Sequence, residues 1–349
     1  MNNLSRRDFL KLGALSTGAL AFRPLTKKAI GSGFNFPDEL GEIGRVAATS
    51  LSIHKEPNDD SVILYQRYRD DLVNIYYEVV AEDGPQNNPI WYRVWGGYIH
   101  SAHLVKVKNQ LNPIQYNIPE EGLLTEVSVP YSQSYRYSPH EGWTPLYRLY
   151  YGSVHWIIGI DEGPDGTPWY KIEDEMDSYY IYYVPAHHLR IIPPNELAPI
   201  SPEIPSENKR IDIDLNRQTL TAFEYDNAVF HTSIASGLPR ANVHPPTNTP
   251  VGEFHVSSKM PSKHMGEGQL TSDIEAYELP GVPWTVFFEP NTGVAMHGTF
   301  WHKNFGTRMS HGCINMVTEE AKWIFRWTTP ISDPVVVEKR GYGTLVRVF

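Results

Sequence analysis

Two stretches of the chain resemble each other, and each consists of short aromatic segments separated by turn residues. The first contains ILYQRYRDDLVNI and PIWYRVWGGYIHSAHLVKV, and the second contains PLYRLYYGSVHWI, TPWYKIEDE and YYVPAHHLRII. Runs rich in Tyr, Trp, Ile and Val that are interrupted by Gly, Pro, Asn and Asp are typical of β-strands joined by tight turns. The repeat therefore predicts two small β-barrel modules, over residues 41–108 and 123–192.

The repeated stretches resemble the Src-homology-type β modules of bacterial proteins, which often accompany enzymes that act on the cell wall. His103 and His188 occupy equivalent places in the two copies. A core or turn role for these histidines is favoured over metal ligation. The resemblance leaves open whether the modules bind glycan, bind peptide or only space the rest of the chain from the wall.

A proline-rich segment, PPNELAPISPEIPSEN, separates the repeat from the rest of the chain. Proline fixes φ and removes a backbone donor, so this segment cannot form a helix interior or a central strand. We predict an extended, semi-rigid linker over residues 193–208 and a third domain over residues 209–349.

The third domain begins with an alternation typical of hairpin strands. Ile211, Ile213 and Leu215 share one face, and turn residues follow at 216–217 and 226–227. TPVGEFHV and WTVFFEPNTGVAMHG also read as strands, whereas residues between them, in the range 257–283, form a long and weakly patterned stretch that predicts a loop.

One helix is predicted close to the C-terminal end of this domain. Thr318 is placed to cap it, and two glutamates follow where a helix N-terminus is positive. Ala321, Ile324 and Phe325 form its apolar stripe, and Pro330 follows its end. The predicted fold class is therefore mainly β, with two small β-barrel modules followed by a β-rich domain that has one clear helix.

The charge argues against nucleic acid as the partner, because the formal net charge is −10 and no long basic run is present. The N-terminal sequence LSRRDFLKLGALSTGALAF places Arg6 and Arg7 before an apolar run. That run has about 11 residues, fewer than the roughly 20 that cross a bilayer. We therefore predict a twin-arginine signal and N-terminal tail over residues 1–33, with the twin-arginine export machinery as a partner and a location in the cell wall or periplasm.

Cys313 is the only cysteine among the 349 residues. Cysteines outside the cytoplasm usually form disulfides, so a single thiol is a buried inert group, an intermolecular bridge or a nucleophile. A thiol attacks carbonyls as the thiolate, and a free cysteine has a pKa of about 8.5, so a neighbouring imidazole is the usual activator. His311 could share a face with Cys313, and His297 could reach it from an adjacent strand, but spacing alone does not choose between them.

A family pattern is present in MHGTFWHKNFGTRMSHGCIN. Its elements are His297-Gly298-Thr299, a Phe305-Gly306 turn and Ser310-His311-Gly312-Cys313, together with TPVGEF upstream. Over residues 209–338 the chain resembles L,D-transpeptidases with a YkuD-type catalytic domain. The resemblance implies cysteine acyl transfer on peptidoglycan stem peptides, without a metal or cofactor. The thiolate attacks the carbonyl between the third residue and D-alanine, D-alanine leaves, and an amine of a neighbouring stem resolves the thioester.

The resemblance also implies a role for each residue of the motif. Cys313 is the nucleophile, His297 is the general base, and the backbone carbonyl of Gly298 orients that imidazole. Backbone amides of the His311–Cys313 turn form the oxyanion hole, and glycine lets this backbone approach a substrate. The implied catalytic residues are Cys313, His297, Gly298, His311, Gly312 and Ser310, of which Ser310 braces the turn and His311 helps to position the nucleophile.

Substrate contacts are expected from the residues around this motif. Many relatives have arginine two residues after the cysteine, where this chain has Asn315, so Arg308 is a candidate substitute for that charge, with a plain surface role as the alternative. The predicted loop matches a lid in the family. The substrate-binding candidates are Asn315, Arg308, Trp301, Met265 and Tyr277. His244, His255 and His264 lack the spacing of metal ligands, so no metal site is predicted.

Three functions remain to be weighed. The preferred one is an exported L,D-transpeptidase. Transfer of the same thioester to water would make an L,D-carboxypeptidase or endopeptidase. A non-catalytic cell-wall-binding protein is the third, and the presence of both Cys313 and His297 argues against it. Papain-like wall peptidases place cysteine before histidine, and this chain has the reverse order.

Overall fold

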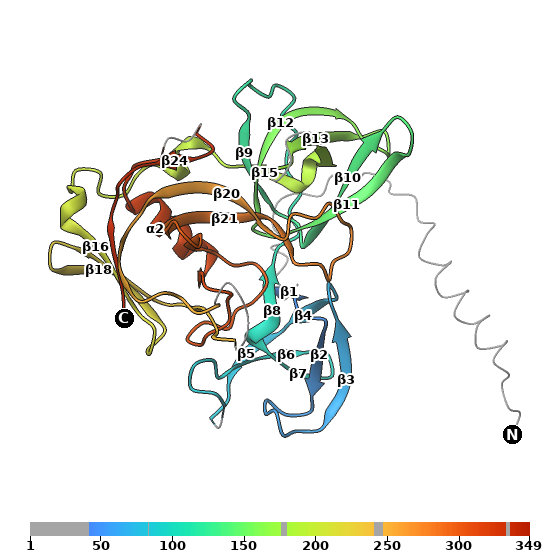
Figure 1. Cartoon of the computed structure of the whole chain (residues 1–349). Helices are drawn as coiled ribbons and strands as arrows, with labels where there is room; N and C mark the ends of the chain where they lie inside the picture. Colours follow the sequence, from blue (N-terminus) through green and yellow to red (C-terminus); the bar gives the residue numbers. More distant parts are fainter. Residues whose placement is uncertain (1–41, 83, 176–179, 241–246, 333–335) are drawn as a thin grey trace, which may run out of the picture. The chain divides into compact units, whose positions relative to one another are not determined.

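The structure is a computed structural model that describes residues 42–82, 84–175, 180–240, 247–332 and 336–349. The predicted signal at residues 1–33 lies outside this range. The described part of the chain is mainly β, which confirms the predicted fold class. Figure 1 shows strands throughout, with α2 as the labelled α-helix. In the described residues, no helix combines the length and apolar character that a membrane crossing requires.

The first β segment, residues 42–107, forms two antiparallel sheets. Their orders are β4-β1-β8 and β3-β2-β7-β6-β5, and a short 3-10 turn, η1 (Ser101–His103), joins β7 to β8. Val46, Ile53 and Leu104 lie in its buried core. The strands are β1 (Glu42–Val46), β2 (Ser50–His54), β3 (Ile63–Tyr68), β4 (Leu72–Ile75), β5 (Tyr77–Val80), β6 (Ile90–Val94), β7 (Gly97–His100) and β8 (Leu104–Val107).

The second β segment, residues 123–191, forms one seven-stranded antiparallel sheet in the order β11-β10-β14-β13-β12-β9-β15. Its core includes Leu146, Ile157 and Tyr170. The strands are β9 (Leu123–Val127), β10 (Tyr131–Ser138), β11 (Gly142–Tyr150), β12 (Val154–Glu162), β13 (Pro168–Glu173), β14 (Ile181–Pro185) and β15 (Leu189–Ile191). The 3-10 turn η2 (Ala186–His188) joins the last two of these strands, as η1 joins β7 to β8. The likeness to Src-homology-type modules stays a prediction.

The proline-rich segment is not extended throughout. It contains two short 3-10 turns, η3 (Pro194–Leu197) and η4 (Ser206–Asn208). The first residue of η3 is Pro194, and the fixed φ of proline suits a helical first turn. Leu197 is buried, and Glu196 accepts hydrogen bonds from Arg190 and Lys322. These contacts attach the segment to its neighbours, so it is more ordered than the predicted linker.

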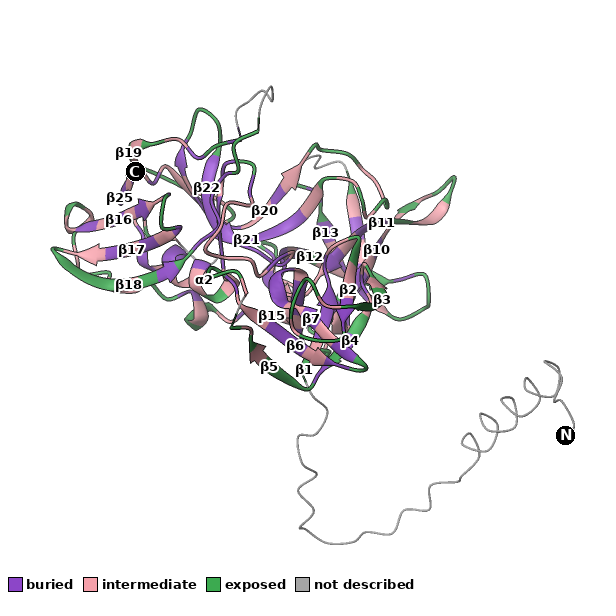
Figure 2. Ribbon diagram, turned by 90° about the horizontal axis from the view of Figure 1, so that it is seen from below, coloured by how far each residue is buried: buried purple, intermediate pink, exposed green. Residues whose placement is uncertain are grey.

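The third segment, residues 209–349, contains two five-stranded sheets and α2. Their orders are β18-β17-β16-β25-β19 and β23-β22-β21-β20-β24. The strands are β16 (Lys209–Asp214), β17 (Thr219–Glu224), β18 (Asn227–Ser233), β19 (Gly252–His255), β20 (Ser258–Gly266), β21 (Glu278–Glu289), β22 (Val294–Gly298), β23 (Ile314–Met316), β24 (Lys339–Arg340) and β25 (Leu345–Val348). Figure 2 shows β21 and β22 largely buried and β18 largely exposed.

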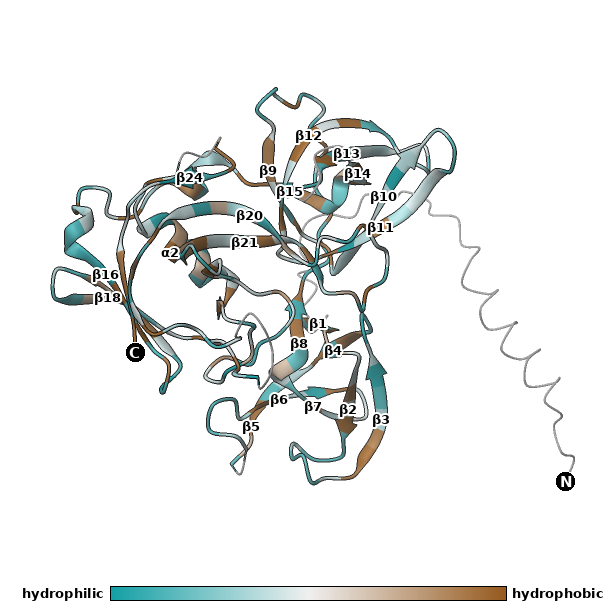
Figure 3. Cartoon of the chain, viewed as in Figure 1, coloured by the Kyte–Doolittle hydropathy of each residue, from teal (hydrophilic) through white to brown (hydrophobic). Residues whose placement is uncertain are grey.

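Helix α2 (Thr318–Trp327) packs its apolar stripe against the sheet that contains β21. Figure 3 shows that the helix carries both hydrophobic and hydrophilic residues, as an amphipathic helix does. The Phe325 ring lies 5.6 Å from the Trp284 ring of β21. The predicted cap is wrong by one position, because Val317 is the N-cap, without a side-chain hydrogen bond, and Thr318 is the first helical residue. The chain passes almost directly from β23 into the helix, which leaves no room for a separate capping turn.

The predicted loop over 257–283 is mostly a hairpin. β20 pairs with β21 from Ser258 opposite Phe287 to Gly266 opposite Glu278. The sequence did not predict these strands, because Pro261 and Pro280 lie within them and apolar residues do not alternate along β20. Figure 1 shows the two strands side by side, next to α2.

Candidate functional site

A cavity of 330 Å³ contains the lone thiol. Eight of the predicted site residues line it, namely Cys313, His297, His311, Ser310, Asn315, Trp301, Met265 and Tyr277. The other lining residues are His103, Leu279, His302 and Met309. Gly298, Gly312 and Arg308 are not among the lining residues, and the Arg308 guanidinium instead donates to the carbonyl of Leu215 at 3.3 Å.

Two adjacent parallel strands bring the thiol and the histidine together. His297 lies on β22 and pairs in register with Asn315 of β23, and Cys313 precedes that strand by one residue. Side chains two residues apart on an extended chain point the same way, so Cys313 and Asn315 both face the side on which His297 lies. Residues 299–313 thus form the connection between two neighbouring strands.

His297 is oriented by the backbone. Its side chain is buried, and Nδ1 lies 3.0 Å from the carbonyl oxygen of Gly298. Nδ1 therefore carries the proton and donates it to this carbonyl, which leaves Nε2 as an acceptor. Gly298 is suited to this place because a Cβ there would lie 2.8 Å from the Pro283 ring. Burial lowers the pKa of His297 to about 4, so the imidazole is neutral at pH 7.

The thiol is also neutral at rest. Burial raises the pKa of Cys313, and a hydrogen bond from the backbone of Ala295 opposes this effect without reversing it. Both partners are thus uncharged, as expected where a low dielectric disfavours an ion pair. The site can generate a thiolate by transferring the proton to a neutral imidazole as the sulfur attacks.

Side-chain hydroxyls hold the turn before Cys313. Ser310 Oγ donates to the carbonyl of Cys313 at 2.5 Å and accepts from the amide of Gly312 at 3.1 Å. Thr249 Oγ1 donates to the Gly312 carbonyl at 2.7 Å and accepts from the Gly237 amide at 2.9 Å. Gly312 has φ +131°, a conformation that glycine adopts readily and other residues rarely do.

One predicted oxyanion donor is already paired. Because the Gly312 amide donates to Ser310 Oγ, it does not point a free hydrogen at a substrate. This corrects the implied oxyanion hole, in which three consecutive amides took part. The amides of His311 and Cys313 remain the candidates.

The two candidate bases differ in environment. His311 is exposed, and its ring lies 5.3 Å from the Tyr277 ring at the edge of the cavity. His297 is buried, lines the same cavity as Cys313 and is tied to the backbone. Trp301 contacts that imidazole, with 5.8 Å between the two ring centres.

Asn315 is held by a second buried histidine. Its side-chain amide lies 2.9 Å from His302 Nε2, while the amide of Asn304 donates to His302 Nδ1 at 3.1 Å. Burial lowers the pKa of His302 to about 3, so its ring is neutral and, with Nδ1 accepting, carries its proton on Nε2. Nδ2 of Asn315 is the atom that faces Nε2 in the structure, so an acceptor reaches this proton when the side-chain amide is turned to place its oxygen there.

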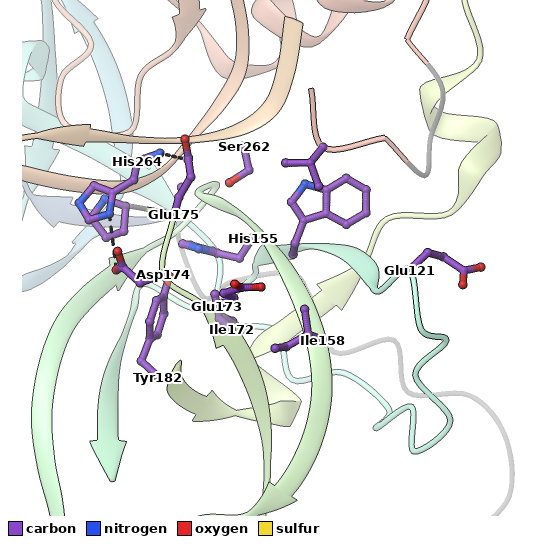
Figure 4. A pocket seen from close by; sticks show the side chains of 14 residues that line it. Glu121, His155, Ile158, Ile172, Glu173, Asp174, Glu175, Tyr182, Ser262 and His264 are labelled. Carbon is purple, nitrogen blue, oxygen red and sulfur yellow. Dashed lines mark hydrogen bonds and ion pairs between the residues drawn. The ribbon is translucent and has the colours of Figure 1, made fainter. Parts of the chain in front are cut away.

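A separate cavity of 270 Å³ lies between the second β segment and the hairpin β20–β21. Figure 4 shows His264 beside Asp174 and Glu175, with His155 and Ser262 nearby. His264 Nε2 also lies 2.9 Å from Glu278. Cys313 is not among the residues that line this cavity. Within the described ranges, no three His, Cys, Asp or Glu residues are grouped as a metal site requires, and His244 lies outside those ranges.

Comparison with known proteins identifies the third segment. Residues 208–337 match the family model of YkuD, the L,D-transpeptidase catalytic domain. L,D-transpeptidase 1 of Mycobacterium tuberculosis is 32% identical over 110 residues, which are 29% of this chain and 41% of that protein. The chain therefore contains a YkuD-type L,D-transpeptidase catalytic domain, which confirms the predicted resemblance for this segment. It spans less than half the length of the curated relatives that it matches.

Solved structures of L,D-transpeptidases are also similar to this chain. A crystal structure of a mutant Enterococcus faecium L,D-transpeptidase is 26% identical, with a TM-score of 0.31 over 41% of this chain and 50% of that chain. An L,D-transpeptidase from Mycobacterium smegmatis is 19% identical, with a TM-score of 0.32 over 51% of this chain and 77% of that chain.

Proposed function

We propose that this protein is an exported L,D-transpeptidase that cross-links peptidoglycan stem peptides through a thioester on Cys313. The observation that carries the proposal is that Cys313 and a neutral, backbone-oriented His297 line one cavity, His297 on β22 and Cys313 immediately before the neighbouring β23. The twin-arginine sequence at the N-terminus supports export, and the catalytic domain supports the reaction class.

In the first half-reaction, the Cys313 sulfur attacks the carbonyl that joins the third stem residue to D-alanine. The thiol proton moves to Nε2 of His297, and the Gly298 carbonyl stabilises the imidazolium through Nδ1. Amides of His311 and Cys313 donate to the oxyanion; a donor of this kind is worth about 3 kcal/mol. The C–N bond then breaks, His297 returns its proton to the leaving amine, and D-alanine departs from the thioester.

In the second half-reaction, an amine of a second stem attacks the thioester carbonyl. His297 takes a proton from the attacking nitrogen and gives it to the departing sulfur, so the enzyme returns to its starting state. The product is an amide that links two stems. Water in place of the amine would give a tripeptide instead, which is the hydrolytic alternative.

Incubation with stem tetrapeptides tests the proposal. The purified protein is mixed with tetrapeptides that end in D-alanine and carry diaminopimelate or lysine at position three, and products are followed by mass spectrometry. We expect free D-alanine, peptide dimers and an acyl adduct on Cys313, all absent from the Cys313→Ala variant. Tripeptides without dimers would identify a hydrolase, and unchanged tetrapeptides would contradict an enzymatic role.

A further inference from the structure

The cavity around Cys313 is not built by the third segment alone. Among its described lining residues, His103 is the one from outside residues 209–349, and it ends the turn η1 of the first β segment. Sequence reasoning favoured a core or turn role for His103, and its place in a turn agrees with that. Its position beside the thiol depends on contacts between distant segments, so nothing local in the sequence could indicate it.

Hydrogen bonds join the first β segment to residues 300–303, which follow His297, the proposed base. The amide of Lys303 donates to the carbonyl of Ala102 at 2.7 Å, immediately before His103. Arg45 donates to the carbonyl of Phe300 at 2.9 Å from a buried position. These two bonds fix His103 against the connection between the strands that carry His297 and Cys313.

The same segment also contacts the hairpin on the other side of the cavity. Arg69 makes a two-pronged ion pair with Glu275, at 2.8 and 2.9 Å. Glu275 lies in the loop between β20 and β21, two residues before Tyr277, which lines the cavity. The first β segment thus contacts two parts of the chain that lead to cavity residues, namely residues 300–303 and the loop between β20 and β21.

The chemistry of His103 suits a contact with a peptide. Burial, and then the nearby His100, lower the pKa of its ring, which is therefore neutral at pH 7. A neutral imidazole has one donor and one acceptor nitrogen. A hydrogen bond to the backbone of Trp301 uses the donor, so the acceptor is the nitrogen that remains.

We propose that His103 is a substrate-contacting residue of the Cys313 cavity, where its ring nitrogen accepts a hydrogen bond from an amide or amine N–H of the stem peptide. The inference rests on the proposed function, since it takes the stem peptide as the occupant. A lone acceptor selects N–H groups and disfavours a carboxylate, so it selects for the peptide backbone or an amine of the stem over the terminal carboxylate of D-alanine.

Direct binding tests this contact without requiring turnover. In full-length protein with Cys313→Ala, calorimetry measures the Kd of the tetrapeptides with diaminopimelate or lysine at position three. Adding His103→Ala is expected to weaken binding about fivefold to tenfold, the value of one hydrogen bond. His103→Gln, which keeps an acceptor oxygen, should recover part of the loss. His188→Ala is the matched control, because His188 holds the equivalent place in the repeat, contacts Ser132 and does not line the cavity.

Equal affinities for the His103→Ala and parent proteins would overturn the inference, as would a parent that binds neither tetrapeptide. An equal loss in His188→Ala would overturn it too, because it would show a general effect of module damage. Melting temperatures establish that each variant is folded. D-alanine release by the unaltered enzyme is measured separately, so failure of the proposed function is distinguished from failure of the His103 contact.

Discussion

At the scale of single residues, the two histidines near Cys313 should have unequal effects on catalysis. His297→Ala removes the buried acceptor nitrogen and is expected to lower kcat/KM for D-alanine release by about 100- to 10,000-fold. His311→Ala changes an exposed ring and should lower it by less than about tenfold. Steady-state kinetics on both variants, with melting temperatures as the fold control, provide the comparison. A larger loss in His311→Ala than in His297→Ala would reverse the assignment of the base.

The buried base also predicts where activity is lost in acid. Because burial lowers the pKa of His297 to about 4, the ring stays neutral, and able to accept a proton, until the pH falls near that value. The profile of kcat/KM against pH should therefore be flat from pH 7 to about pH 5 and fall below it. Circular dichroism at each pH separates this loss from unfolding. An acid limb centred near 6.5, the ordinary histidine value, would show that the base is solvated.

At the scale of elements, regular apolar patterns in the sequence predicted strands and the helix, and segments without such a pattern were not predicted. The alternation of Ile211, Ile213 and Leu215 gives buried positions on β16 and just after it, and the helix begins and ends close to its predicted limits. The hairpin β20–β21 was missed because its strands are defined by pairing with each other and not by a local apolar pattern. Strand formation of this kind depends on tertiary context.

A buried lysine beside the C-terminal end of α2 makes the stability of the fold depend on pH. Lys259 is buried and donates to the carbonyl of Thr328 at 2.8 Å, just past the last helical residue. Burial, followed by the positive charge of Lys209, lowers the pKa of Lys259 to about 7, whereas an unfolded lysine titrates near 10.4. Between these values the unfolded chain binds a proton that the folded chain lacks, so the free energy of unfolding rises with pH.

Lys259→Met should remove this rise. We expect the unfolding free energy of the unaltered protein to gain about 1 kcal/mol per pH unit relative to the variant between pH 7 and 10. Urea denaturation across that range measures the difference. Lys263→Met, on the same strand but partly exposed and paired with Glu175, is the control for loss of a lysine. Parallel pH profiles for the unaltered protein and Lys259→Met would show that Lys259 is charged in the fold.

At the scale of the whole molecule, the site could be predicted only in part. The residues within one sequence motif, Ser310 to Cys313, lie together, and the strand with His297 lies beside them. His103 enters from roughly two hundred residues away along the chain, through packing of the first β segment on the third. No periodicity or spacing reports such contacts, because they depend on how folded segments fit together.

Arg45 tests whether that packing supports catalysis. It is buried, pairs with Asp70 at 3.0 Å and donates to the carbonyl of Phe300, whereas the partly exposed Arg148 pairs with the other Asp70 oxygen at 2.6 Å and does not reach Phe300. Arg45→Met leaves the Oδ1 atom of Asp70 without its arginine and frees the Phe300 carbonyl, so it should cost about 1–3 kcal/mol of stability and also lower kcat. Arg148→Met, the matched control, should cost less stability and leave kcat unchanged. If Arg45→Met lowered stability but kept full activity at a temperature where it is folded, the first β segment would stabilise the enzyme without shaping its site.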